Sequence, residues 1–385
     1  SEPQYMSELA SYSLQTIVLS GLALAYFSKS KKIDAYSLGL IVFWTIGVIY
    51  IYARYRTDQV QFYSNDQAIH QLIVEYYIPM EGTNLGSTIS LRYIITLPAY
   101  FLSRFGLNVV LLFKFSQLVF ALLIFQHARY VLEKYDIRVK RWMVLYFAGP
   151  LLVFMSLLAL RDVLLAFFTL LFVFPTTPKS RYLGLVVVAL LRPHLAAALV
   201  FGLIAEYLYR RAKPRLLVTG HVITLLISYA IGALSFPIGN FVMNGNQLKI
   251  PSTIFSIEYF SQIGLNLVGL QFLILDGEDA GVVAASTIFL LFIRLIFIDT
   301  ILVPSTFFFF CTKPVKLVRR ETMQISAAMF FFYGLIFQNQ IVTNSTRQNL
   351  PFITVMGVIA VIRICDYHAI KGQPYSLGKI EVPTA

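Results

Sequence analysis

Apolar residues in this chain gather into runs that are long enough to cross a lipid bilayer. A helix needs about 20 apolar residues to span the ~30 Å hydrocarbon core. The 385-residue chain is 58% hydrophobic and 13% charged, whereas soluble domains are about 25% charged. We therefore predict an all-α, polytopic transmembrane bundle of about 9–11 spans, some of them short hairpins that reach mid-membrane. This single transmembrane domain takes up residues 1–385 and carries external surface helices.

Basic residues at the ends of the apolar runs predict how the chain is oriented. The first run ends at Lys29, Lys31 and Lys32, and the positive-inside rule places such clusters in the cytoplasm. The N-terminus is then outside, and segments 54–90 and 236–279 form external loop regions. The net charge of +12 therefore reflects membrane orientation and attraction to anionic lipids, and it does not indicate nucleic acid binding.

The segment 90–106 is apolar but short, and it contains Pro98. It is either a span or a helix lying on the outer membrane surface. Residues 107–125 form a span that ends at the basic segment 129–141. A single span before that segment places it inside, so the surface helix is favoured.

Two stretches predict hairpins whose tips stop inside the membrane. Residues 142–174 are interrupted at Arg161, and residues 182–209 are interrupted at Arg192. Several arms are shorter than the roughly 20 residues of a full span, and both stretches begin and end at basic residues. Broken backbone at that depth is tolerated where it is buried in protein or lines a watery cavity.

Arginines within apolar stretches are the first candidate site residues. They are Arg161, Arg192, Arg294 and Arg347. A guanidinium near the membrane centre costs at least ~2.5–3.5 kcal/mol, so each needs a partner or a purpose. Structural pairs with Asp162 or Asp299 are one interpretation. The other is an outward-facing electropositive cavity for phosphate or pyrophosphate, to which arginine makes bidentate contacts.

Ionisable residues on the external and hairpin segments are the next candidates. Asp66 and Asp58 are either solvated loop carboxylates or, for Asp66 at the start of a short surface helix, a general base in glycosyl transfer. His194 either packs beside a proline turn or orients a phosphate, and His70 has the same two interpretations. Cys311 lies near a predicted cytoplasmic helix end and has no metal-ligand spacing, which predicts neither a disulfide nor a metal site.

This pattern resembles the GT-C superfamily of polyprenyl-dependent membrane glycosyltransferases. Within it, the pattern is most similar to bacterial O-antigen and exopolysaccharide polymerases of the Wzy/EpsG kind. The resemblance is carried by Asp66 in an early external loop, Leu160-Arg161-Asp162, Leu191-Arg192-Pro193-His194, and Arg347 in the last outer loop before Pro351.

The resemblance implies a metal-independent enzyme without a cofactor in the bacterial inner membrane, with its active site facing the periplasm. Its donor and acceptor would be polyprenyl-pyrophosphate-linked saccharides, with membrane lipids around it and a chain-length regulator as a candidate protein partner. Asp66 would be the catalytic base, and His194 would assist. Arg161, Arg192 and Arg347 would hold the donor pyrophosphate, with Arg161 taking part in catalysis. The further substrate-binding candidates are Arg294, Asp58 and His70.

The chain departs from this family in two ways. It is short for many polymerases, and it lacks a large external loop between its late spans. A transferase that adds one sugar from a polyprenyl-phosphate donor therefore stays open beside a polymerase. A transporter or flippase for a lipid-linked anion would also contain buried arginines, but the sequence has no inverted repeat. An assembly scaffold would not need arginines at depth.

Overall fold

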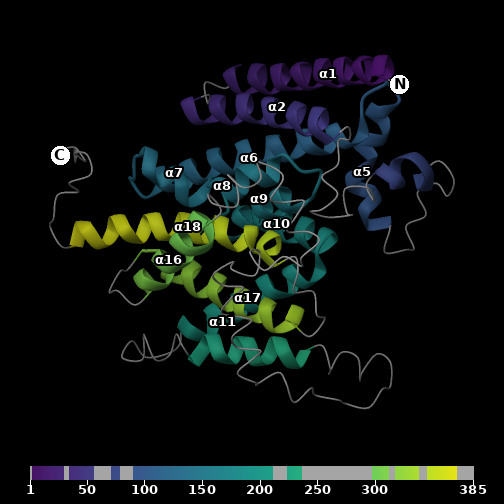
Figure 1. Ribbon diagram of the computed structural model, residues 1–385. Coiled ribbons are helices and arrows are strands. Elements are labelled where there is room, and N and C mark those ends of the chain that lie inside the picture. The colour runs from purple at the N-terminus through teal and green to yellow at the C-terminus, as the bar shows by residue number, and fades with distance from the viewer. Residues whose placement is uncertain are drawn as a thin grey trace, which may run out of the picture. The chain divides into compact units, whose positions relative to one another are not determined.

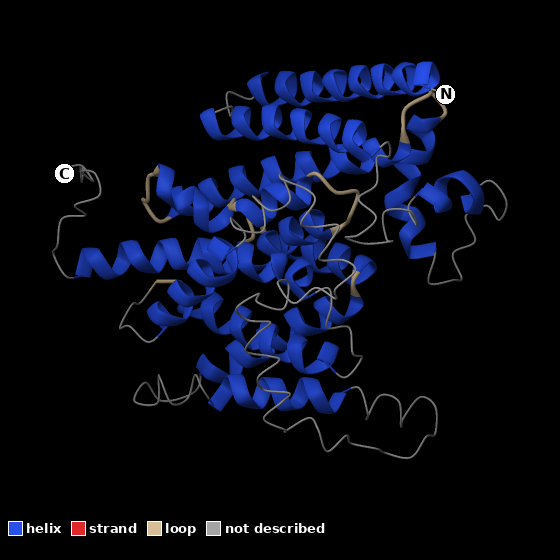
Figure 2. Ribbon diagram, in the orientation of Figure 1, coloured by secondary structure: helices blue, strands red, loops and turns tan. Residues whose placement is uncertain are grey.

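The computed structural model describes residues 2–29, 34–55, 71–78, 90–210, 223–235, 297–311, 317–337 and 345–370. Within these ranges all regular structure is helical and no strand occurs (Figure 2). Four helices of the described chain are long and apolar enough to cross a membrane: Gln4–Lys29, Ala35–Arg54, Val109–Lys134 and Gln348–Ile370. The predicted all-α membrane-type fold is confirmed to this extent.

The described chain divides into two compact units. The first unit comprises the described residues of Ser1–His127 and of Ala148–Phe168. The second unit comprises Ala128–Phe147 and the described residues of Thr169–Ile274 and Phe297–Ala385. Because the chain leaves the first unit and returns to it, each unit is built from segments that are distant in sequence.

In the first unit, helices α1 (Glu2–Lys29) and α2 (Ala35–Tyr55) lie side by side (Figure 1). The hydroxyl groups of Ser20 and Thr45 are hydrogen-bonded across the pair at 2.7 Å. Large apolar side chains of the pair are exposed, among them Leu14, Ile17, Val18, Leu22, Val42 and Ile46. An apolar face without protein cover is typical of a helix that contacts lipid.

Helix α2 is also joined to α8 (Pro150–Ser156), which lies much later in the chain. The indole Nε1 of the fully buried Trp44 donates to the carbonyl oxygen of Ser156 at 2.8 Å. The hydroxyl of Tyr36 donates to the carbonyl oxygen of Ala148 at 2.7 Å. The bond to Ser156 satisfies a carbonyl at the C-terminal end of α8, and the bond to Ala148 holds the segment just before it. With seven residues, α8 is too short to span a bilayer.

The outer segments of the first unit are short and irregular helices. The π-helix η1 (Ile73–Tyr77) packs against α5 (Ser90–Ser103), where Tyr100 covers the buried side chain of Ile73. The 14 residues of α5 extend about 21 Å at 1.5 Å per residue, which is less than the ~30 Å of the hydrocarbon core. This length favours the predicted surface helix over a span. The next helix is α6 (Val109–Lys134).

The second unit is centred on α18 (Ser345–Ile370), most of which is buried. Its neighbours are α7 (Arg141–Phe147), α16 (Val303–Cys311) and α17 (Arg319–Phe337). A Cβ atom at Gly357 would lie only 1.8 Å from the carbonyl oxygen of Tyr146 in α7. Only glycine therefore allows these two helices to approach so closely.

Helix α11 (Pro193–Arg210) packs along α17 in the same unit. A Cβ atom at Gly202 would lie 2.3 Å from the carbonyl oxygen of Gln324, so this contact is also set by a glycine. The guanidinium of Arg320 lies 4.0 Å from the buried carboxylate of Glu206. Close backbone approach through small residues is the usual way in which membrane helices associate.

The start of α18 corrects one prediction. Arg347 was predicted in an outer loop before Pro351, but α18 begins at Ser345 and contains both residues. The backbone of Arg347 lies in the first helical turn. The run of polar residues around it therefore forms the end of a helix and not a loop. Pro351 is the seventh residue of α18 and lies inside the helix, where its missing N–H removes the helical hydrogen bond to the carbonyl of Arg347.

The described part of the segment around Asp299 begins with an irregular helical turn. The π-helix η5 (Ile298–Leu302) precedes α16, and Pro304 lies in the first turn of α16. The carboxylate of Asp299 is buried, as is the neighbouring Thr300. Cys311 at the end of α16 and Cys365 in α18 are both free thiols.

Candidate functional site

The first arginine, Arg161, lies at a break between two short helices. Helix α8 ends at Ser156, residues 157–161 are not helical, and α9 (Asp162–Val173) begins directly afterwards. The first N–H groups of α9 point toward the break, where Arg161 is half-buried and Asp162 is buried. The predicted interruption is therefore confirmed, although its depth in a membrane is still a prediction.

Helix α6 closes one side of this break. The side-chain oxygen of Gln117 accepts a hydrogen bond from the backbone N–H of Val163 at 3.2 Å. Lys114 precedes Gln117 by three residues, so both side chains lie on the same face of α6. Both are buried, and Lys114 is completely so. The apolar run 107–125 contained a lysine that sequence reasoning did not single out.

The second break is built by the main chain around Arg192. It separates α10 (Pro178–Leu191) from α11, and Arg192 has φ −151° and ψ 84°. Its N–H donates to the carbonyl of Val188 at 2.8 Å, and its own carbonyl accepts from Leu195 at 3.0 Å. Pro193 begins α11, where the missing N–H would have no intrahelical partner in any case. A non-helical residue thus ends one helix and starts the next.

The side chains at this second break have different surroundings. The side chain of Arg192 is inside the second unit, where the residue is 7% exposed. His194, two residues later in the first turn of α11, is exposed. The break therefore separates the guanidinium from the imidazole, one buried and one at the surface of the unit.

The remaining predicted site residues are described only in part. Asp58, Asp66, His70 and Arg294 lie outside the described residues. Of Arg347 only the backbone is described, and it lies in the first turn of α18. Among the described residues, no group of three or more His, Cys, Asp or Glu side chains is arranged to hold a metal ion.

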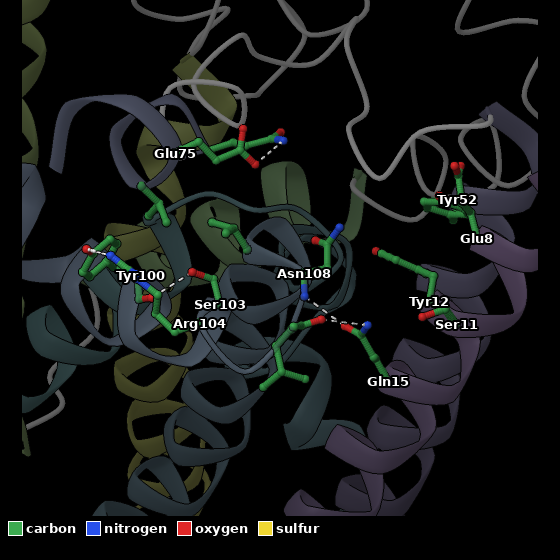
Figure 3. Close-up of a pocket in the computed structure, with 15 residues that line it drawn as sticks. Glu8, Ser11, Tyr12, Gln15, Tyr52, Glu75, Tyr100, Ser103, Arg104 and Asn108 are labelled. Carbon is green, nitrogen blue, oxygen red and sulfur yellow. Dashed lines mark hydrogen bonds between the residues drawn. The ribbon is translucent and has the colours of Figure 1, made fainter. Parts of the chain in front are cut away.

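A polar cavity of about 540 Å³ lies in the first unit, which no single motif predicted. It is lined by Glu8, Ser11, Tyr12, Gln15, Tyr52, Gln71, Val74, Glu75, Tyr100, Ser103, Arg104, Gly106, Leu107, Asn108 and Val109. Figure 3 shows Glu8, Tyr12 and Tyr52 on one side and Glu75, Tyr100 and Arg104 on the other. Of these residues, Gln71, Val74 and Glu75 fall in the predicted external region 54–90.

The wall between α5 and α6 is held by the side chain of Gln15. Its amide oxygen accepts from the N–H of Asn108 at 2.9 Å, and its amide nitrogen donates to the carbonyl of Gly106 at 3.3 Å. Gly106 has φ +80°, a left-handed conformation that glycine adopts at little cost. The side chain of Asn108 accepts from the N–H of Leu111 at 2.9 Å and so caps α6.

The charged groups of the cavity stand at its open side. Glu8, Glu75 and Arg104 are all exposed. The guanidinium of Arg104 donates to the hydroxyl of Tyr100 and lies 5.0 Å from the centre of its ring. The carboxylate of Glu75 accepts from the amide of Gln71 at 2.8 Å.

The cavity lies at the helix ends that are opposite to the basic clusters. Glu8 to Gln15 are in the first half of α1, which ends at Lys29, and Val109 starts α6, which ends at Lys134. The positive-inside rule then predicts that the cavity opens toward the outer face.

Comparisons with known proteins identify no relative of this chain. No protein-family model matches the chain, and neither curated protein sequences nor solved structures give a significant match. The function is therefore argued from the two helix breaks, the cavity and the chemistry of their residues.

Proposed function

We propose that the chain is a membrane glycosyltransferase that polymerises polyprenyl-pyrophosphate-linked oligosaccharide repeat units at the periplasmic face of the bacterial inner membrane. The observation that carries the proposal is the pair of helix breaks at Arg161 and Arg192. Each break puts an arginine beside the start of a helix within a strongly apolar chain. The resemblance to GT-C polymerases rests in part on these same residues.

The chemistry of the breaks suits the binding of a phosphate group. Helix N-termini carry partial positive charge and N–H groups without intrahelical partners, which favours anions. α9 begins next to Arg161 and α11 next to Arg192. A guanidinium adds two parallel donors that match two phosphate oxygens. A lipid-linked pyrophosphate is an anion that remains at a membrane, and it therefore fits such a place.

The proposed reaction is transfer of a saccharide from pyrophosphate to a hydroxyl group. The acceptor oxygen forms a bond to the anomeric carbon of the donor, while the bond from that carbon to the pyrophosphate oxygen breaks. The bonding electrons leave with the pyrophosphate, whose charge the arginines would stabilise. Asp66, as general base, would take the proton of the acceptor hydroxyl.

Analysis of the product by gel and mass spectrometry tests the proposal. Purified protein in lipid nanodiscs is incubated with the polyprenyl-pyrophosphate oligosaccharide of its own host. A ladder spaced by whole repeat units is expected. Asp66→Asn should reduce the rate about 100-fold or more, and Arg161→Ala should also remove most of the ladder.

Arg129→Ala is the matched control, because Arg129 is exposed at the opposite end of α6 and pairs with Glu133. Its ladder should equal that of the wild type. No ladder from folded wild-type protein would contradict the polymerase. Addition of one sugar from a polyprenyl-phosphate donor would instead indicate a single-sugar transferase. Movement of a lipid-linked saccharide at unchanged mass would indicate a transporter.

A further inference from the structure

The polar cavity of the first unit has a lining whose charge is unsuited to phosphate. We infer that it binds the saccharide part of the lipid-linked substrate, as an uncharged or amino-bearing sugar, and leaves the phosphates to the helix break at Arg161. The identity of the saccharide rests on the proposed function. The choice of a sugar over an anion rests on the cavity itself.

The charges of the lining carry the first step. Glu8 and Glu75 bring two carboxylates, and Arg104 brings one guanidinium that is already engaged with the hydroxyl and ring of Tyr100. The lining therefore has an excess of negative charge. A phosphate in the cavity would be repelled, whereas hydroxyl or ammonium groups would find strong acceptors.

The remaining side chains suit a ligand with many hydroxyl groups. The rings of Tyr12 and Tyr52 are stacked with centres 4.2 Å apart, and Tyr100 stands on the other side of the cavity. Aromatic rings present an apolar surface to the C–H groups of a sugar, and tyrosine adds a polar edge. Gln71 and Ser11 also line the cavity and can both donate and accept hydrogen bonds.

The size and stiffness of the cavity fit a small ligand. Its volume of about 540 Å³ lies within the ~300–1,000 Å³ of small-molecule sites. Gln15 donates one hydrogen bond to Gly106 and accepts one from Asn108, and these bonds hold the wall before any ligand arrives. A wall that is already ordered reduces the entropy lost on binding.

The position of the cavity along α6 fits a substrate with a sugar at one end and phosphates behind it. Val109 lines the cavity, and Gln117 contacts Val163 at the break that contains Arg161. These two residues of α6 are separated by about 12 Å at 1.5 Å per residue. Both features belong to the first unit. With its saccharide in the cavity, the substrate could therefore place its pyrophosphate farther toward the membrane interior, at the break that contains Arg161.

A binding measurement tests this inference. The probe is the dephosphorylated repeat-unit oligosaccharide of the host, titrated into the full-length protein in nanodiscs by calorimetry. The variants are the double substitution Glu8→Gln with Glu75→Gln, and separately Ser11→Trp, which fills the cavity from an exposed position of α1. Each should raise the dissociation constant at least about tenfold. Glu133→Gln, an exposed carboxylate at the other end of α6, should leave it unchanged.

Inorganic pyrophosphate is the competing probe, and it should not displace the oligosaccharide from the wild type. The inference is overturned if both sets of cavity variants bind like the wild type, or if pyrophosphate competes in the wild type and not in the variants. The ladder assay on the same samples separates the two proposals. If the wild type gives a normal ladder and the cavity variants bind and react like it, only this inference is contradicted. Cavity-dependent binding without any ladder would sink the polymerase alone.

Discussion

The second unit buries two arginines in two different ways. Arg363 lies within the regular helix α18 and is 3% exposed, and Arg192 lies between two helices and is 7% exposed. The guanidinium of Arg363 donates to the carbonyl of Phe310 through Nε at 3.1 Å and Nη2 at 2.8 Å. It also donates to the hydroxyl of Thr322 at 3.1 Å. At Arg192 the main chain makes bonds on both sides of the break, to the carbonyl of Val188 and from the N–H of Leu195.

The difference teaches that burial alone does not mark a functional arginine. Arg363 satisfies a carbonyl in the last turn of α16, where no later N–H of that helix can reach it, so it has a structural role. The break at Arg192 is held by backbone hydrogen bonds and by Pro193. None of these main-chain bonds involves the guanidinium of Arg192. The stability of the fold should depend on Arg363, and the reaction should depend on Arg192.

The largest effect is expected at Arg363. Arg363→Met keeps an apolar stem of similar length but leaves the carbonyl of Phe310 without its donors. The free energy of unfolding should fall by about 3 kcal/mol, seen as a lower midpoint of thermal unfolding in nanodiscs. Product formed per folded molecule should stay near the wild-type value. An unchanged midpoint, or lost activity in fully folded protein, would remove the contrast with Arg192.

Arg192→Lys should have the opposite pattern. Lysine keeps the positive charge but lacks the planar pair of donors that matches two phosphate oxygens. The rate of chain extension should fall about 100-fold, which corresponds to ~2.7 kcal/mol of transition-state stabilisation. The unfolding midpoint should change little, because the main chain makes the break. Lys179→Arg in the exposed first turn of α10 is the control. A large loss of stability with normal turnover would make Arg192 a structural residue as well.

Gly357→Ala tests how much stability the close packing around α18 contributes. The added Cβ would lie 1.8 Å from the carbonyl oxygen of Tyr146, so α7 and α18 would have to move apart. Overpacking of this kind costs about 2 kcal/mol, which thermal unfolding would detect while turnover per folded molecule is retained. Gly21→Ala is the matched control, since nothing lies within 4 Å of the added atom. Equal midpoints for the two variants would mean that close packing at α18 contributes little stability.

Local signals in the sequence predicted the breaks well. Arg161 and Arg192 interrupt apolar arms that are too short to span a membrane, and Pro193 adds a residue that cannot continue the preceding helix. The structure has a break at each position. The prediction succeeded because charge, arm length and proline all act on residues close in sequence.

Contacts between distant segments were not predictable in the same way. Arg363 bonds to Phe310, 53 residues earlier, and nothing near Arg363 in the sequence indicates that partner. The cavity collects residues from Glu8 to Val109, each of which is ordinary by itself. Arg347 was predicted in a loop because its neighbours are polar, yet packing buries Gln348 in the same turn of α18. Tertiary burial here outweighs the local preference of polar residues for loops.

The hydrogen bonds of Tyr36 and Trp44 also affect the order in which the protein folds during synthesis. Tyr36 and Trp44 each bond to a carbonyl 112 residues later in the chain. At about 5–20 residues per second of synthesis, those partners emerge roughly 6–22 s after the two side chains. During that interval a phenol and an indole must be accommodated by lipid headgroups, by water or by the translocation machinery. The pair of α1 and α2 thus reaches its final structure only after α8 has been made.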